Sequence, residues 1–172
     1  MIRTERLTLL GWHLRHVDPF VRLHGDAATM QHFGSGHALD AVEAWLELAK
    51  LLGHWQLRGY GVWAVEEAEG GAWVGRAGLF HPPGWPRAEL NWMIAPEQRG
   101  AGYATEAAAA ALDFALGPLG LPEVISLVRP GNVPSLHVVR KLGGELAETI
   151  TFLGAPMHVC RYVRPRSHPR PQ

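Results

Sequence analysis

Alternating apolar and polar residues predict a sheet with strands in both halves of the chain. The alternation that begins at Leu7 indicates a first strand over Arg6–Trp12. Two segments rich in Val, Trp and Tyr, Tyr60–Glu67 and Ala72–Phe80, flank a glycine-containing turn and are typical of an antiparallel hairpin. Further strands are expected at Ala88–Ile94, Glu123–Val128 and Val159–Val163.

Two helices are expected between the first strand and the hairpin. Asp18-Pro19 is typical of a helix start, and a short helix over Phe20–Gly25 follows. The next helix has a capping box at Asp40, carries apolar residues at helical intervals and is expected to end at Gly53. Its apolar positions are Val42, Trp45, Leu46, Ala49 and Leu52.

Two more helices complete the expected order. The alanine-rich run from Thr105 to Phe114 predicts a helix that ends at Gly117-Pro118, and Asn132 caps another that ends at Gly143. A chain of 172 residues, 47% hydrophobic and 19% charged, suits one packed mixed α/β domain. We expect that domain over residues 1–163 and a flexible, basic, proline-rich tail over 164–172.

Charge and cysteine content exclude several classes of protein. Lys plus Arg and Asp plus Glu are each 16, so no overall field gathers nucleic acid, and we expect no DNA partner. No apolar stretch approaches the roughly 18 residues of a membrane helix, the start lacks a signal-peptide core, and Cys160 is a lone cysteine, so we expect a cytoplasmic protein. The histidines lack a cysteine or carboxylate partner at ligand spacing, so no metal site is expected. The sequence leaves open whether the protein forms a homodimer.

The most informative segment follows the strand that ends near Pro96. Gly100 and Gly102 lack a Cβ, so the backbone can take unusual dihedrals and approach oxygen atoms closely. The helix that follows directs unpaired N–H groups outward, which predicts a phosphate site. The segment is neither a Walker loop nor a dinucleotide fingerprint, so a nucleotide carrier of another type is indicated.

The stretch Arg99-Gly100-Ala101-Gly102-Tyr103-Ala104 resembles the pyrophosphate loop of the GNAT N-acetyltransferase superfamily. More narrowly, the chain resembles the RimJ/RimL branch, the ribosomal-protein N-terminal acetyltransferases and their relatives, from about Thr4 to Tyr162. The segments that carry this resemblance are Thr4-Glu5-Arg6-Leu7, Ala95–Ala107, Asn132-Val133-Pro134-Ser135 and Lys141-Leu142-Gly143.

The resemblance implies a single-domain GNAT fold with a mixed, mostly antiparallel twisted sheet of six to seven strands and about four helices. Its parallel strands Ala88–Ile94 and Glu123–Val128 splay apart to form the cleft for acetyl-CoA, the expected cosubstrate. Met93 and Ile94 would bond the pantetheine arm through their backbone, and Asn132 would contact it near the thiol. The pyrophosphate contacts would come from Arg99, Gly100, Ala101, Gly102, Tyr103 and Ala104, with a hydroxyl from Thr105.

Two residues are expected to carry the chemistry. Glu89 stands where this branch often has a carboxylate, and strand alternation puts it on one face with Asn91 and Met93, so we expect it to act as the base, through water. Ser135 would lie beside the departing sulfur as the general acid. A solvated strand carboxylate and a simple helix cap are the competing interpretations of Glu89 and Ser135.

Four positions depart from the family pattern. A tyrosine that many members use is Val139 here, and a strand glutamate of some members is Leu127. Asn91 replaces a usual Gly and Gly144 a usual Phe, so both are expected to reshape the acceptor pocket.

We therefore expect transfer of an acetyl group from acetyl-CoA to a primary amine, either a protein N-terminus or a small-molecule amine, by direct attack. Cys160, on the last strand, is a poor nucleophile. The alternatives are an acetyltransferase of a drug-like or metabolite amine and a catalytically idle acyl-CoA sensor.

Overall fold

The computed structural model describes residues 1–34 and 36–163, and this part of the chain forms one open sheet of eight strands in the order β1-β2-β3-β4-β5-β6-β8-β7. Neighbouring strands are antiparallel except for β5 and β6, which are parallel. The expected tail over 164–172 lies outside the described residues. The strands are β1 (Ile2–Arg3), β2 (Leu7–Leu10), β3 (Val62–Glu67), β4 (Trp73–Phe80), β5 (Glu89–Ile94), β6 (Glu123–Val128), β7 (Glu145–Phe152) and β8 (Ala155–Val163).

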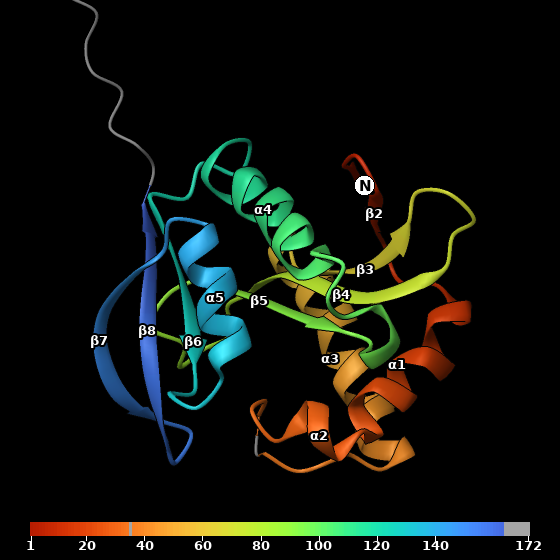
Figure 1. The fold of residues 1–172 in the computed structure, drawn as a ribbon, viewed down its shortest axis with the longest axis horizontal. Helices are drawn as coiled ribbons and strands as arrows, with labels where there is room; N and C mark the ends of the chain where they lie inside the picture. The colour runs from red at the N-terminus through yellow and green to blue at the C-terminus, as the bar shows by residue number, and fades with distance from the viewer. Residues whose placement is uncertain (35, 164–172) are drawn as a thin grey trace, which may run out of the picture.

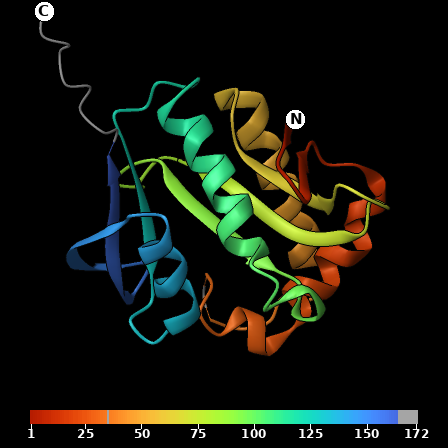
Figure 2. The same cartoon turned by 45° about the horizontal axis from the view of Figure 1, so that its top comes forward.

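Helices cover both faces of this sheet (Figures 1 and 2). They are α1 (Val17–Gly25), α2 (Ala27–Met30), α3 (Ala41–Arg58), α4 (Tyr103–Leu116) and α5 (Val133–Lys141). Helices α4 and α5 lie on one face, and α1 and α3 on the other. The mixed α/β fold agrees with the expectation. The elements that were not expected individually are the two-residue β1, the single turn α2 and the eight-residue β7. No helix within the described ranges is long and apolar enough to span a membrane.

Helix α4 lies close to the sheet because its inner face is made of small side chains. Ala107, Ala108, Ala111 and Ala115 are completely buried. The helix contacts β2, β4, β5 and β6, so a single alanine face crosses the middle of the sheet. Its packing fixes where the start of the helix lies relative to the end of β5.

Two predictions for helix α3 (its end and its buried face) are wrong. It continues through Gly53 and ends at Gly59, whose backbone is left-handed (φ 72°) and whose N–H bonds the Trp55 carbonyl. The expected apolar face is also wrong, since Trp45 is 55% exposed. The face that packs against the sheet consists of Ala44, Leu48, Leu51 and His54. The capping box is confirmed, because Glu43 N donates to Asp40 Oδ1 at 2.8 Å and Asp40 N donates to Glu43 Oε2 at 2.9 Å.

Strands β5 and β6 separate almost as soon as they meet. Among the described residues they pair at one position, Glu89 opposite Ile125. One residue further along β6, the buried Ser126 donates from Oγ to the Leu90 carbonyl at 2.7 Å and lies 3.2 Å from the Tyr162 hydroxyl. The Ser126 side chain therefore bonds the Leu90 carbonyl, to which a backbone amide of β6 would donate in a continuous parallel ladder. Beyond it the strands diverge, as the resemblance implied (Figure 1).

The N-terminal segment holds the start of α4. The Glu106 carboxylate accepts hydrogen bonds from Thr4 Oγ1 at 2.6 Å and from the backbone N and Nε of Arg6 at 2.9 and 2.8 Å. Arg6 Nη1 also donates to the Ala101 carbonyl at 2.9 Å. The opening motif and the glycine-rich turn are thus joined in space by hydrogen bonds.

Replacing Glu106 by Gln leaves the side chain in place but removes the charge that accepts these bonds. We expect a melting temperature lower by about 3–6 °C, because several charge-assisted hydrogen bonds weaken together. Calorimetric melting of Glu106→Gln measures this. Glu69→Gln, in the exposed β3–β4 turn, is the matched control. Equal melting temperatures for the two variants would show that the clamp contributes nothing.

Candidate active site

The turn before α4 presents backbone amides to the solvent at one end of the cleft. Gly100 and Gly102 both have left-handed backbones, with φ of 83° and 85°, which a side chain would strain. The first bond of the helix runs from Glu106 N to the Gly102 carbonyl at 3.2 Å. The amides of residues 103–105 precede that bond, so they point out of the helix end, where the backbone dipole favours an anion. A pyrophosphate fits this turn.

The side chains of the turn hold it to neighbouring elements and leave its backbone facing outward. Arg99 donates from Nε to the Ile94 carbonyl at 3.2 Å and from Nη2 to Thr29 Oγ1, on α2, at 2.5 Å. The Tyr103 hydroxyl donates to Glu67 Oε1 at 2.9 Å, so its ring packs toward β3. Both side chains act as anchors of the turn.

The gap between β5 and β6 opens into a cavity of about 300 Å³. Along β5 the Leu90 and Ile94 carbonyls face this side, and strand alternation places the backbone of Trp92 there as well. The Met93 carbonyl faces β4, since a Cβ built on Gly75 would lie 2.2 Å from it. Ile94 therefore offers backbone groups to the gap, and Trp92, in place of Met93, offers the second set.

Seven of the expected site residues line this cavity: Glu89, Met93, Ile94, Arg99, Ala104, Asn132 and Ser135. The others belong to the turn and the first residues of α4: Gly100, Ala101, Gly102, Tyr103 and Thr105. The turn thus lies beside the mouth of the cavity, as a phosphate site for a long, extended ligand requires.

A second cavity, of about 290 Å³, is lined by parts of α1, α3, β4 and the β7–β8 hairpin. Five residues line both cavities: His32, Phe33, Glu89, Asn91 and Leu127. The two spaces therefore meet at the start of β5. A ligand in the strand gap and a second ligand in the other cavity can approach each other at Glu89.

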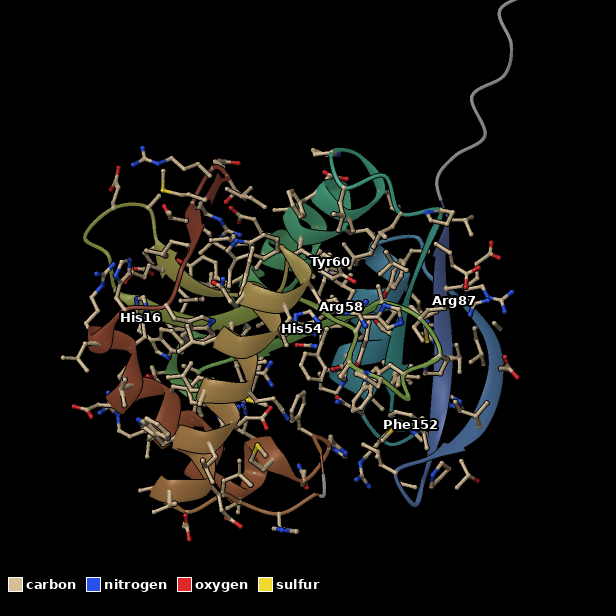
Figure 3. The ribbon with its side chains drawn as sticks, turned by 180° about the vertical axis from the view of Figure 1, so that it is seen from behind. His16, His54, Arg58, Tyr60, Arg87 and Phe152 are labelled. Atoms are coloured by element: carbon tan, nitrogen blue, oxygen red, sulfur yellow. The ribbon has the colours of Figure 1, made fainter. Side chains whose placement is uncertain are left out.

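The Glu89 carboxyl is partly buried at this junction and accepts a hydrogen bond at Oε2 from Trp85 Nε1 at 2.6 Å. Removal from water raises its pKa to about 7, against the opposing effects of the Trp85 bond and of the positive charges on Arg76 and Lys50. Phe152, at the tip of the β7–β8 hairpin, packs edge-on against Trp85 with centroids 5.0 Å apart (Figure 3). These contacts are not those of a solvated strand carboxylate.

Ser135 lies in the first turn of α5 beside the strand gap. Asn132 is the residue that caps this helix, with its Oδ1 accepting from Ser135 N at 3.2 Å. The cap thus comes from Asn132, and the Ser135 side chain is left partly buried at the cavity wall. Its position suits a hydroxyl that donates a proton into the gap.

The departures from the family pattern have separate consequences. Val139 is 3% exposed within the core, and Leu127 lines both cavities. A Cβ on Gly144 would lie 2.6 Å from the Tyr162 ring, so no phenylalanine fits there. Gly144 lines neither of the two cavities, whereas Asn91 lines both. Of these two positions, only Asn91 therefore lines a cavity in which an acceptor could bind.

Arg76 was missed by the sequence analysis. It lies on β4, is 1% exposed and lines the second cavity. Its Nη1 donates to Asn91 Oδ1 at 2.9 Å. The available signal was one charged residue within the otherwise uncharged run Val74-Gly75-Arg76-Ala77-Gly78. Among residues 1–34 and 36–163, no three or more His, Cys, Asp or Glu side chains are grouped to hold a metal ion.

Comparison with known proteins gives a family match over most of the chain. The sequence profile described as "Acetyltransferase (GNAT) domain" matches residues 6–145. A solved acetyltransferase from Agrobacterium tumefaciens str. C58 is 30% identical with a TM-score of 0.85, covering 95% of this chain and 94% of that one. The chain spans between 32% and 62% of the length of the curated relatives it matches.

Two more distant solved structures share the fold. Spermidine N-acetyltransferase from Vibrio cholerae, in complex with CoA and spermine, is 23% identical with a TM-score of 0.73, covering 92% of this chain and 94% of that one. RimL, a ribosomal L7/L12 alpha-N-protein acetyltransferase in complex with coenzyme A, is 15% identical with a TM-score of 0.76, covering 93% and 95%. The neighbours thus include RimL and also other acetyltransferases.

Replacing Trp85 by Phe removes the indole N–H while keeping an aromatic ring. Because that N–H stabilises the ionised carboxylate, we expect the pKa of Glu89 to rise by about one unit from its value of about 7. Infrared difference spectra follow the protonated-carboxyl band, which is missing in Glu89→Gln. Trp45→Phe, at an exposed position, is the control. An unshifted titration in Trp85→Phe would contradict the assigned bond.

Replacing Gly102 by Val places a branched side chain at the left-handed end of the helix. We expect binding of coenzyme A to be lost while the fold largely persists, since no built Cβ there comes closer than 3.5 Å to a neighbour. Calorimetric titration measures the affinity. Gly120→Val, also left-handed (φ 70°) but in the turn after α4, controls for backbone strain. Normal affinity in Gly102→Val would refute the phosphate site.

Proposed function

Because the chain belongs to the GNAT acetyltransferase domain family, we propose that it transfers the acetyl group of acetyl-CoA to a primary amine that occupies the second cavity. The observation that supports this most directly is the Glu89 carboxyl, which has a pKa of about 7 and stands where the two cavities meet. A group that is half ionised near neutral pH at that position is suited to take a proton from an incoming amine.

The strand gap and the turn fit acetyl-CoA, which supplies an acetyl group activated as a thioester. The amides of Gly100 to Thr105 hold the pyrophosphate, and the left-handed glycines keep side chains away from it. The backbone groups of Trp92 and Ile94 replace the missing β6 partner as bonding sites for the extended arm. Asn132 lies at the far wall of the same cavity.

Glu89 accepts the proton that an ammonium must lose before its nitrogen can attack. Since only the ionised carboxylate can do this, base catalysis by Glu89 declines as the pH falls below about 7. Trp85 fixes the carboxylate in place through its N–H. Much of the rate enhancement then comes from holding amine and thioester together at the junction of the cavities.

Ser135 donates the proton that the leaving thiolate takes up. No acyl-enzyme is involved, because Cys160 is 1% exposed, burial raises the pKa of its thiol, and its side chain packs in the core. The same lone, buried cysteine supports a cytoplasmic enzyme.

The acceptor is identified by mass spectrometry of amine mixtures and peptides with free N-termini, incubated with the protein and isotope-labelled acetyl-CoA. The named relatives include a spermidine and a ribosomal-protein acetyltransferase, so polyamines and N-terminal peptides belong in the panel. If the protein is instead a catalytically idle acyl-CoA sensor, we expect tight cofactor binding and no labelled product with any amine.

Glu89→Gln and Ser135→Ala remove the two proton-transfer groups. We expect each to lower kcat by about 100-fold, while the affinity for acetyl-CoA stays within about twofold, since neither side chain holds the pyrophosphate. Steady-state kinetics and calorimetry give the two quantities. Glu148→Gln, exposed on β7, is the control. Unaltered pH–rate profiles in both active-site variants would dismiss these roles.

A further inference from the structure

Arg76 is the largest of the fully buried side chains in the described part of the protein, at 1% exposure. It lies in the middle of β4, opposite Met93 of β5, and its side chain reaches the second cavity. A charged group at such a position is costly unless other groups bond it and balance its charge. Its partners therefore indicate what the cavity is built to hold.

The guanidinium is only partly bonded. Nη1 donates to Asn91 Oδ1, and the Phe33 ring stacks on the group with its centroid 4.5 Å from Cζ. Nε and Nη2 have no hydrogen-bond partner among the described residues. These two atoms form one edge of the guanidinium, and their parallel N–H groups match the two oxygens of a carboxylate.

Among the described residues no carboxylate forms an ion pair with Arg76, although the charges on Glu47 and Glu89 partly offset the lowering of its pKa by burial. Lys50 and Glu47 pair with each other at 2.5 Å. The Glu89 carboxyl is bonded by Trp85, and burial holds the pKa of His24 at about 3, so His24 is neutral. The guanidinium therefore has no directly bonded anion and presents an edge without hydrogen-bond partners next to the expected position of the amine.

We propose that Arg76 binds a carboxylate of the acceptor, so that the substrate class is an amine that also carries a carboxylate, an amino acid or a close analogue. This inference rests on the proposed acetyl transfer and specifies its acceptor. The amine lies toward Glu89, and the carboxylate accepts hydrogen bonds from Nε and Nη2, the unbonded edge of the guanidinium. A polyamine has no oxygen that can accept hydrogen bonds from this edge, and its positive charges are disfavoured next to Arg76.

Binding of the carboxylate requires a local shift, because Nε and Nη2 are closed to solvent in the free protein. Phe33, which stacks on the guanidinium and lines both cavities, is the neighbouring side chain that can move.

The test compares L-amino acids with their amides, which differ only in the carboxylate, and includes spermidine. With the full chain and acetyl-CoA, we expect at least one amino acid to be acetylated with kcat/KM at least about 10-fold above that of its amide. Calorimetry of that amino acid with the protein–CoA complex gives a second readout that is independent of turnover.

Arg76→Met keeps most of the side-chain volume and needs no partner, so the fold is expected to persist. We expect kcat/KM for the amino acid to fall about 10- to 100-fold more than that for its amide, and calorimetric binding of the amino acid to be lost. Removal of the Arg76 charge also raises the pKa of Glu89, which affects the rates with acids and amides alike. Arg58→Met, on the exposed end of α3 (Figure 3), removes the same charge elsewhere and is the control. If Arg76→Met does not fold, the wild-type comparison of acids with amides decides the question alone.

Equal use of acids and amides, preference for spermidine, or a retained acid preference in a folded Arg76→Met protein would overturn the inference. Acetylation of amides or spermidine alone leaves the proposed transferase activity standing and refutes only the role of Arg76. Absence of product with every amine, together with absence of amino-acid binding, refutes both.

Discussion

The separation of β5 from β6 is the constraint on which the rest of the structure depends. Two parallel strands of six residues each would ordinarily pair along their length, but here they pair once, at Glu89 and Ile125. Ser126 takes the next carbonyl with its hydroxyl, in contact with Tyr162. The unpaired remainder of β5 then offers backbone donors and acceptors to a ligand, which is the reason the cavity lies beside these strands.

Burial where the two cavities meet shifts the pKa values of two charged side chains. Removal from water raises the pKa of Glu89 to about 7 and lowers that of Arg76 to about 10. Each charge is held in position by one side-chain hydrogen bond, from Trp85 and to Asn91 respectively. A carboxyl with a pKa near neutrality and a guanidinium with an unbonded edge therefore line the same cavity, which is the arrangement on which the proposed amino-acid acceptor rests.

Acetyltransferases that share this fold can be named for different acceptors. The solved structures that share this fold include enzymes named for a polyamine and for a ribosomal protein. In this protein the clamp of Thr4 and Arg6 on Glu106 is bonded to the glycine turn through the Ala101 carbonyl, and the turn lies at the end of the strand gap. Arg76, on β4, lines the second cavity and not the strand gap, whereas its partner Asn91, on β5, lines both.

The sequence by itself determined the features that depend on neighbouring residues. The caps at Asp40 and Asn132 and the unusual backbone dihedrals at Gly100 and Gly102 were predicted, because backbone conformation there follows from residues a few positions apart. The tertiary structure alone decided which face of α3 is buried, since both faces carry apolar residues and only packing on the sheet distinguishes them. It also decided the environment of Arg76, because burial and unpaired N–H groups arise from segments far apart in the chain.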